Sequence, residues 1–235
     1  MKVRNSPNCN DRSEKGIKYL ILHYTGMETA DDAIDRLCDP AAKVSAHYLI
    51  KENGEIISMV PEERRAWHAG LSKWEDDVDI NDRSIGIELV NTGHPYEGYD
   101  SVYENFPVEQ INALTGLCLK IVKRHNIKPC YILGHSDVAW RRKIDPGELF
   151  DWQELADKGI GLFPVIGIHH EETSLEVGLF LSKLHNFGYD IEDAIDNPQE
   201  IITAFQRHYR PHNICGVLDD ETVLIIDKLL ADKLS

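Results

Sequence analysis

Two histidines in this chain follow short apolar runs of the kind that form β-strands. His23 comes directly after residues 19–22, and His135 comes just after residues 131–133. If both runs belong to one sheet, the two imidazoles can lie at the same edge of it. Two histidines and one carboxylate are the protein ligands of catalytic zinc sites, which keep a fourth position open for water. The pattern therefore predicts a zinc site, with structural histidines at strand ends as the alternative.

The carboxylate ligand of such a site has two candidates in the sequence. Asp137 lies nearer to His135, but aspartates in loops of this kind often accept hydrogen bonds from backbone amides instead. Asp145 lies in the run Lys-Ile-Asp-Pro-Gly, at residues 143–147. The residues by themselves leave both candidates open.

Five motifs occur in a fixed order along the first two thirds of the chain. They are Ser-Ala-His-Tyr-Leu-Ile (45–50), Ala-Trp-His-Ala-Gly (66–70), Ser-Ile-Gly-Ile-Glu-Leu (84–89), Gly-His-Ser-Asp (134–137) and Arg-Lys-Ile-Asp-Pro-Gly (142–147). Together they resemble the zinc-dependent N-acetylmuramoyl-L-alanine amidases, the type-2 amidases that share a fold with peptidoglycan-recognition proteins. The resemblance covers roughly residues 4–152.

The resemblance implies a complete catalytic set. It implies zinc ligands His23, His135 and Asp145, a catalytic Glu88, and Lys143 beside the reacting carbonyl. In that chemistry a carboxylate takes a proton from the attacking water, and a fixed cation stabilises the developing oxyanion. The implied reaction is hydrolysis of the amide bond between N-acetylmuramic acid and L-alanine, in peptidoglycan or in its muropeptide fragments, during bacterial cell-wall recycling or remodelling.

Several other residues are candidates for contact with the substrate. Trp67 offers a flat face to sugar or lactyl carbons, and it stands with His68 in a segment that we expect to line a groove. Tyr24 follows the first metal-binding histidine and can border the same groove. Asn81 and Ser84 are expected to contact the peptide stem.

The order of predicted elements favours a mixed α/β fold. Apolar β-type runs end at His23 and His135, and Asn53-Gly54 between two further runs indicates a hairpin. Apolar residues at three- and four-residue steps after Pro107 predict a long helix. A hairpin among alternating strands and helices predicts a central mixed β-sheet flanked by helices, not a purely parallel one.

The sequence changes character after Trp152. Residues 159–164 read as a linker, and from Thr173 onward apolar residues recur at helical spacing, with Leu175 among the first. We therefore predict an amidase domain at residues 1–165 and a small three-helix module at residues 166–235. The module weakly resembles the three-helix peptidoglycan-binding domain, and a helical tail that only stabilises the enzyme is the alternative. The apolar faces are wide for so small a bundle, which favours docking onto the main domain.

Charge, hydropathy and cysteine content exclude some classes of function and favour one cellular location. A net charge of −15 over 235 residues argues against binding to nucleic acid or to an anionic membrane. The chain has no apolar run long enough for a transmembrane helix, and its start lacks the apolar core of a secretory signal. Five scattered cysteines favour a reducing cytoplasm. The cell envelope is the alternative if an export signal was trimmed.

Other functions are compatible with the same sequence. A recognition protein of the same fold would bind muropeptides without cleaving them, and a wall-anchoring scaffold would act chiefly through its C-terminal helices. Within the enzyme class, a γ-D-glutamyl bond of the stem peptide is another target. A cytoplasmic location favours 1,6-anhydro fragments as the substrate, whereas a wall-binding appendage favours the polymer. The oligomeric state stays open.

Overall fold

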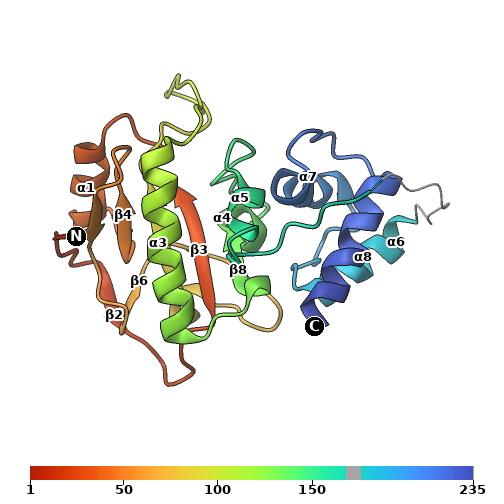
Figure 1. Cartoon of the computed structure of the whole chain (residues 1–235), viewed down its shortest axis with the longest axis horizontal. Coiled ribbons are helices and arrows are strands. Elements are labelled where there is room, and N and C mark those ends of the chain that lie inside the picture. Colours follow the sequence, from red (N-terminus) through yellow and green to blue (C-terminus); the bar gives the residue numbers. More distant parts are fainter. Residues whose placement is uncertain (168–175, 235) are drawn as a thin grey trace.

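The centre of the fold is a mixed β-sheet of six strands, in the order β1-β5-β4-β7-β3-β8. The computed structural model describes residues 1–167 and 176–234 (Figure 1). The six strands are β1 (Lys2–Val3), β3 (Tyr19–Tyr24), β4 (Tyr48–Ile50), β5 (Ile56–Ser58), β7 (Ser84–Leu89) and β8 (Ile132–Gly134). A separate antiparallel pair is formed by β2 (Cys9–Asp11) and β6 (Arg64–Ala66). The predicted mixed sheet is confirmed.

The helices lie between and after these strands. They are α1 (Ala30–Cys38), α2 (Ile80–Arg83), α3 (Val108–His125), the 3-10 turn η1 (Pro129–Tyr131), α4 (His135–Val138), α5 (Trp152–Ala156), α6 (Val177–Phe187), α7 (Pro198–Tyr209) and α8 (Asp220–Leu234). The long helix expected after Pro107 is α3, and Figure 1 shows it lying across the sheet. It ends at Asn126, which takes the left-handed conformation common at helix C-termini.

Parallel pairing of β3 with β7 and with β8 positions the site. The register places His23 of β3 beside Glu88 of β7, and Leu22 beside Gly134 of β8. The carboxyl ends of these three strands therefore meet at one edge of the sheet. Hairpin partners β4 and β5 are antiparallel, as the Asn53-Gly54 turn predicts.

The two faces of the sheet are covered by different parts of the chain. Leu20 and Leu22 of β3 pack in one apolar cluster with Leu114 of α3. Tyr19 and Ile21, which alternate with them, belong to the cluster that contains the C-terminal helices. Strands buried on both faces explain why β3 and β7 are nearly continuous in apolar residues.

Helices α6, α7 and α8 share one core with the rest of the molecule. Trp74 is fully buried, with its ring centroid 5.8 Å from that of Phe187 and 4.7 Å from that of Tyr189. At Gly188, where φ is +140°, a Cβ would lie 2.4 Å from the indole of Trp74, so the backbone approaches closely there. The expected docking of the helices onto the main domain is confirmed, and Figure 1 shows them at the end of the molecule beyond α4 and α5.

The predicted boundary between residues 165 and 166 falls in a stretch without regular structure. Gly159 and Gly161 have positive φ angles, and residues 162–167 form neither helix nor strand. The expected start of the helical pattern at Thr173 and Leu175 lies outside the described residues. None of the helices that the structure describes is long and apolar enough to cross a membrane.

Candidate active site

Three buried side chains converge at the carboxyl end of the central strands. Nδ1 of His23 lies 3.0 Å from Nδ1 of His135, and both nitrogens lie 3.0 Å from Oδ2 of Asp145. In a tetrahedral zinc site with bonds of about 2.0–2.1 Å, the ligand atoms stand about 3.3 Å apart. The triangle therefore fits three protein ligands of one zinc ion in size and in donor type. Within residues 1–167 and 176–234 it is the one group of three such ligands.

The three candidate ligands come from different elements that the fold brings together. His23 lies near the end of β3, and His135 is the first residue of α4, directly after β8. The following loop turns back because Ala139 O accepts hydrogen bonds from backbone N–H groups of the loop, at residues 142 and 143. Ser136 N–H then donates to Asp145 O at 2.9 Å, which holds the carboxylate ligand beside the histidine.

Burial and mutual contact set the protonation of this cluster. Burial and the neighbouring His135 lower the pKa of His23 to about 4, against the opposing effect of Asp145. Burial alone would raise the pKa of Asp145, but the charges and hydrogen bonds of His135 and His23 outweigh it and hold that pKa well below its usual range. A neutral imidazole and an ionised carboxylate are the forms that bind a metal.

Asp137, the other candidate for the carboxylate ligand, has a different role. It is fully buried, and its Oδ2 accepts hydrogen bonds from Gly134 N–H and from His208 Nδ1–H, both at 2.7 Å. Its Oδ1 accepts from the hydroxyl of Tyr189 at 2.6 Å. All its partners are protein groups, two of them in the C-terminal part of the chain. Asp137 is therefore a structural residue, and Asp145 completes the triangle.

Glu88 lies inside the sheet, on the strand next to His23, and faces the cleft. Its Oε2 is buried and makes no hydrogen bond. Burial and the nearby charge of Asp145 raise the pKa of Glu88 well above its usual value, partly offset by Lys143. Its place on an inner strand rules out the simpler explanation of an edge-strand carboxylate that faces water.

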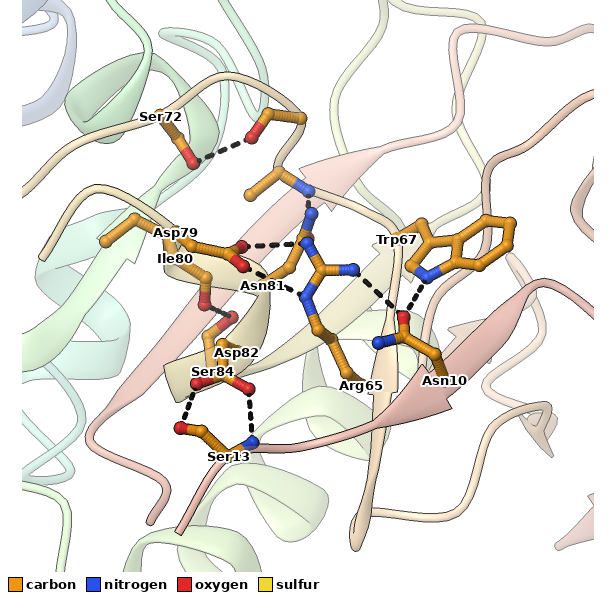
Figure 2. A network of polar contacts seen from close by, with 12 residues as sticks. Asn10, Ser13, Arg65, Trp67, Ser72, Asp79, Ile80, Asn81, Asp82 and Ser84 are labelled. Carbon is orange, nitrogen blue, oxygen red and sulfur yellow. Dashed lines mark hydrogen bonds and ion pairs between the residues drawn. The ribbon is translucent and has the colours of Figure 1, made fainter. Parts of the chain in front are cut away.

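The cleft around the cluster has a volume of about 620 Å³. Lys143, Tyr24, Trp67 and His68 all line it, as the sequence predicts. The indole N–H of Trp67 donates to Oδ1 of Asn10 at 2.6 Å (Figure 2), which holds the ring at the rim.

Two predicted substrate contacts are corrected by the structure. Asn81 and Ser84 are buried and do not line the cleft. Asn81 Oδ1 accepts the backbone N–H groups of His68 and Ala69, at 2.9 and 2.7 Å. Ser84 Oγ lies 3.0 Å from Nε2 of His68. Because their polar groups face protein partners, both residues support the cleft wall and do not meet a ligand.

His94 is one of the cleft residues that the sequence analysis did not single out. His94, in the loop after β7, lies with Nδ1 3.1 Å from the hydroxyl of Tyr24 and with Nε2 3.0 Å from Glu148. Glu148 in turn lies 3.4 Å from Nε of Arg207 on α7, so the C-terminal part reaches toward this wall. The sequence offers no periodic signal there, since His94 stands in an irregular loop between glycine and proline.

Comparison with known proteins identifies the family of this chain. Residues 12–148 match the family model of N-acetylmuramoyl-L-alanine amidases. The chain is 38% identical over 231 residues to the N-acetylmuramoyl-L-alanine amidase AmiD of Escherichia coli, covering 91% of this chain and 82% of that protein. It is 40% identical over 111 residues to the 1,6-anhydro-N-acetylmuramyl-L-alanine amidase AmpD of Citrobacter freundii, covering 47% and 54%.

Solved structures show the same fold over nearly the whole chain. AmiD from E. coli, in complex with the substrate anhydro-N-acetylmuramic acid-L-Ala-D-γ-Glu-L-Lys, superposes with a TM-score of 0.83 at 36% identity, covering 97% of this chain and 93% of that one. AmpDh3 from Pseudomonas aeruginosa, in complex with anhydromuramic pentapeptide, gives a TM-score of 0.81 at 32% identity, with coverage of 93% and 92%.

These matches decide the class of protein. The chain belongs to the N-acetylmuramoyl-L-alanine amidase family. It is an enzyme that hydrolyses the amide bond between N-acetylmuramic acid and L-alanine in peptidoglycan or its muropeptide fragments, and not a receptor that only binds them.

Proposed function

We propose that His23, His135 and Asp145 hold one zinc ion that serves this hydrolysis. The observation that carries the proposal is the triangle of ligand atoms with 3.0 Å edges, open to a cleft of about 620 Å³. When bound, zinc supplies a Lewis acid that polarises the scissile carbonyl and lowers the pKa of water toward about 7. The negative charge of Asp145 offsets part of the metal charge.

Glu88 is proposed as the general base. Its Oε2 has no protein partner, and its raised pKa brings the carboxylate nearer to the working pH, where a base is most effective. It takes a proton from the attacking water and returns it to the leaving amine of L-alanine. Lys143, which lines the same cleft, is proposed to stabilise the oxyanion that forms as the carbonyl is attacked.

The proposed substrate is an anhydro-muropeptide fragment. Two similar enzymes were solved with such ligands, anhydro-N-acetylmuramic acid-L-Ala-D-γ-Glu-L-Lys in AmiD and anhydromuramic pentapeptide in AmpDh3. Tyr24 and Trp67 offer aromatic faces to the sugar and lactyl carbons. All five cysteines are free thiols, which favours a reducing compartment. We therefore propose a cytoplasmic location, where soluble fragments are the available substrate.

Metal analysis tests the proposed zinc site. The purified protein is expected to contain close to one equivalent of zinc per chain, and His135→Ala is expected to lose it, because the two remaining protein donors cannot hold the ion alone. Stoichiometric zinc that survives removal of both His23 and His135 would place the metal elsewhere and refute the assignment.

Product analysis tests the bond that is cleaved. Mass spectrometry of an anhydro-muropeptide digest is expected to show a free peptide that begins with L-alanine and a sugar without peptide. Chelator should abolish both products. If the digest instead contains shortened peptides that are still attached to the sugar, the enzyme is an endopeptidase.

A further inference from the structure

Both metal-binding histidines use Nδ1 for the metal cluster and turn Nε2 toward the same short segment. Nε2 of His135 lies 3.1 Å from the carbonyl oxygen of Ala69. Nε2 of His23 lies 3.0 Å from Nδ1 of His68. Two adjacent residues, which come from neither metal-binding loop, therefore contact the far side of both imidazoles.

The contact with Ala69 determines which nitrogen of His135 carries the proton. Nε2 of His135 also lies 3.4 Å from Nη2 of Arg142, but its contact with the Ala69 carbonyl is the shorter one, at 3.1 Å. A carbonyl oxygen only accepts hydrogen bonds, so in this contact Nε2 of His135 is the donor. A neutral imidazole has a single N–H, and Nδ1 therefore keeps its lone pair for the metal. The Ala69 carbonyl thus selects the tautomer that coordinates through Nδ1.

A longer chain of hydrogen bonds selects the Nδ1-coordinating tautomer of His23. The Ser84 hydroxyl donates to the carbonyl of Ile80 at 2.6 Å, as Figure 2 shows. The hydroxyl has only one hydrogen, which it donates to Ile80, so Ser84 Oγ accepts a hydrogen bond from Nε2–H of His68 at 3.0 Å. Nδ1 of His68 is then unprotonated and accepts from Nε2–H of His23, which leaves Nδ1 of His23 free for the metal.

The segment is held so that it cannot easily change this pattern. Asn81 Oδ1 accepts the backbone N–H groups of both His68 and Ala69. The ring of His68 lies over the bare backbone of Gly86, where an added Cβ would stand 2.4 Å from its Cγ. Only 8% of His68 is exposed, so the ring has little space to turn.

We propose that His68 and Ala69, supported by Ser84 and Asn81, are positioning residues that fix the Nδ1-coordinating tautomer of both metal-binding histidines. The inference rests on the proposed zinc site and deepens it. Partners behind metal ligands orient the ligand and contribute roughly 10- to 100-fold to metal affinity. In this chain the two partners are neighbours in one segment, so one local support serves both ligands.

The tautomers can be read directly in the zinc-loaded, otherwise unaltered protein. Long-range ¹H–¹⁵N correlation spectra of protein labelled with ¹⁵N-histidine are expected to show His23, His68 and His135 as neutral rings protonated at Nε2. A His68 ring protonated at Nδ1 would overturn the proposal, because it could not then accept from His23. This measurement does not depend on any variant being folded.

Variants supply the second test, with zinc affinity measured by competition with a chromophoric chelator. Ser84→Ala and His68→Phe are expected to raise the Kd for zinc by roughly 10- to 100-fold. The matched control is His47→Phe. His47 is also fully buried, with its ring centroid 5.7 Å from that of His68, but it accepts Gly86 N–H and touches no metal ligand.

The control separates positioning from general stability. His47→Phe is expected to lower Tm while leaving the zinc Kd unchanged. If Ser84→Ala and His68→Phe fold and bind zinc as tightly as the parent, the proposal is wrong although the zinc site stands. If the parent protein binds no zinc, the proposed function itself fails.

Discussion

Replacing Glu88 by glutamine is expected to reduce hydrolysis by roughly 100-fold or more while leaving the zinc content unchanged. The amide has nearly the shape of the carboxylate but cannot take a proton from water. Glu88 stands beside His23 in the sheet but is not part of the ligand triangle, so the metal should remain. Rates on an anhydro-muropeptide, followed by chromatography of the released peptide, and metal analysis of the same sample measure both effects.

Glu88→Asp is the matched control for this result. It keeps the negative charge but draws the carboxylate back by one methylene. If Glu88 is a general base, the variant should retain only part of the hydrolysis rate. If the role of Glu88 is purely electrostatic, the rate should be nearly unchanged. Activity of Glu88→Gln within a few-fold of the parent would show that Glu88 is structural. The base would then have to be sought among other groups that line the cleft.

Deleting the C-terminal part, residues 166–235, is expected to cost the enzyme its folded state and its activity on every substrate. The deletion would expose core residues of the main domain, among them Trp74 and Ile21. It would also remove Tyr189 and His208, two partners of the buried Asp137. Removing a partner of a buried charged group costs about 3–5 kcal/mol, a large part of the roughly 5–15 kcal/mol that stabilises a typical domain.

Thermal unfolding and two substrates distinguish the possible roles of these helices. If they complete the core, Tm should fall and hydrolysis of sacculi and of a soluble muropeptide should decline together. If they only bind the wall, the KM for sacculi should rise while the soluble substrate is cleaved as before. We expect the loss of stability to dominate. A truncated enzyme that is fully stable and equally active on sacculi would contradict both roles.

A pair of point variants gives the same test without removing a segment. Phe205 on α7 is fully buried in the shared core, and Phe205→Ala is expected to cost about 3–5 kcal/mol. Val217 is 62% exposed in the same part of the chain, and Val217→Ala should change Tm little. Equal effects of the two substitutions would mean that α7 is not part of a common core.

The family resemblance and local sequence patterns were enough to predict the active-site centre. His23 and His135 end apolar runs, and such runs become the inner strands of a sheet because they can be buried on both faces. The long helix α3 follows from apolar residues at helical spacing. Glu88 stood out because an unpaired carboxylate inside an apolar strand is costly to bury, which favoured a place in the wall of an active site. It lies on β7, between β4 and β3, and lines the cleft.

The roles of several polar residues depend on contacts between distant parts of the chain. Asp137 and Asp145 were both candidates from their own neighbourhoods, and the family resemblance favoured Asp145. In the structure Asp137 pairs with His208, which lies 71 residues from it in sequence. Asn81 and Ser84 were expected to meet the peptide stem, but their partners are His68 and its neighbour. The role of a polar side chain depends on the group with which it forms a hydrogen bond. Partners that are distant in sequence come together only when the chain has folded. Apolar periodicity is local, and for this reason the strands, the long helix and the two strand-end histidines could be predicted from residue patterns. The same patterns left open the carboxylate of the candidate site and the hydrogen bonds that support it.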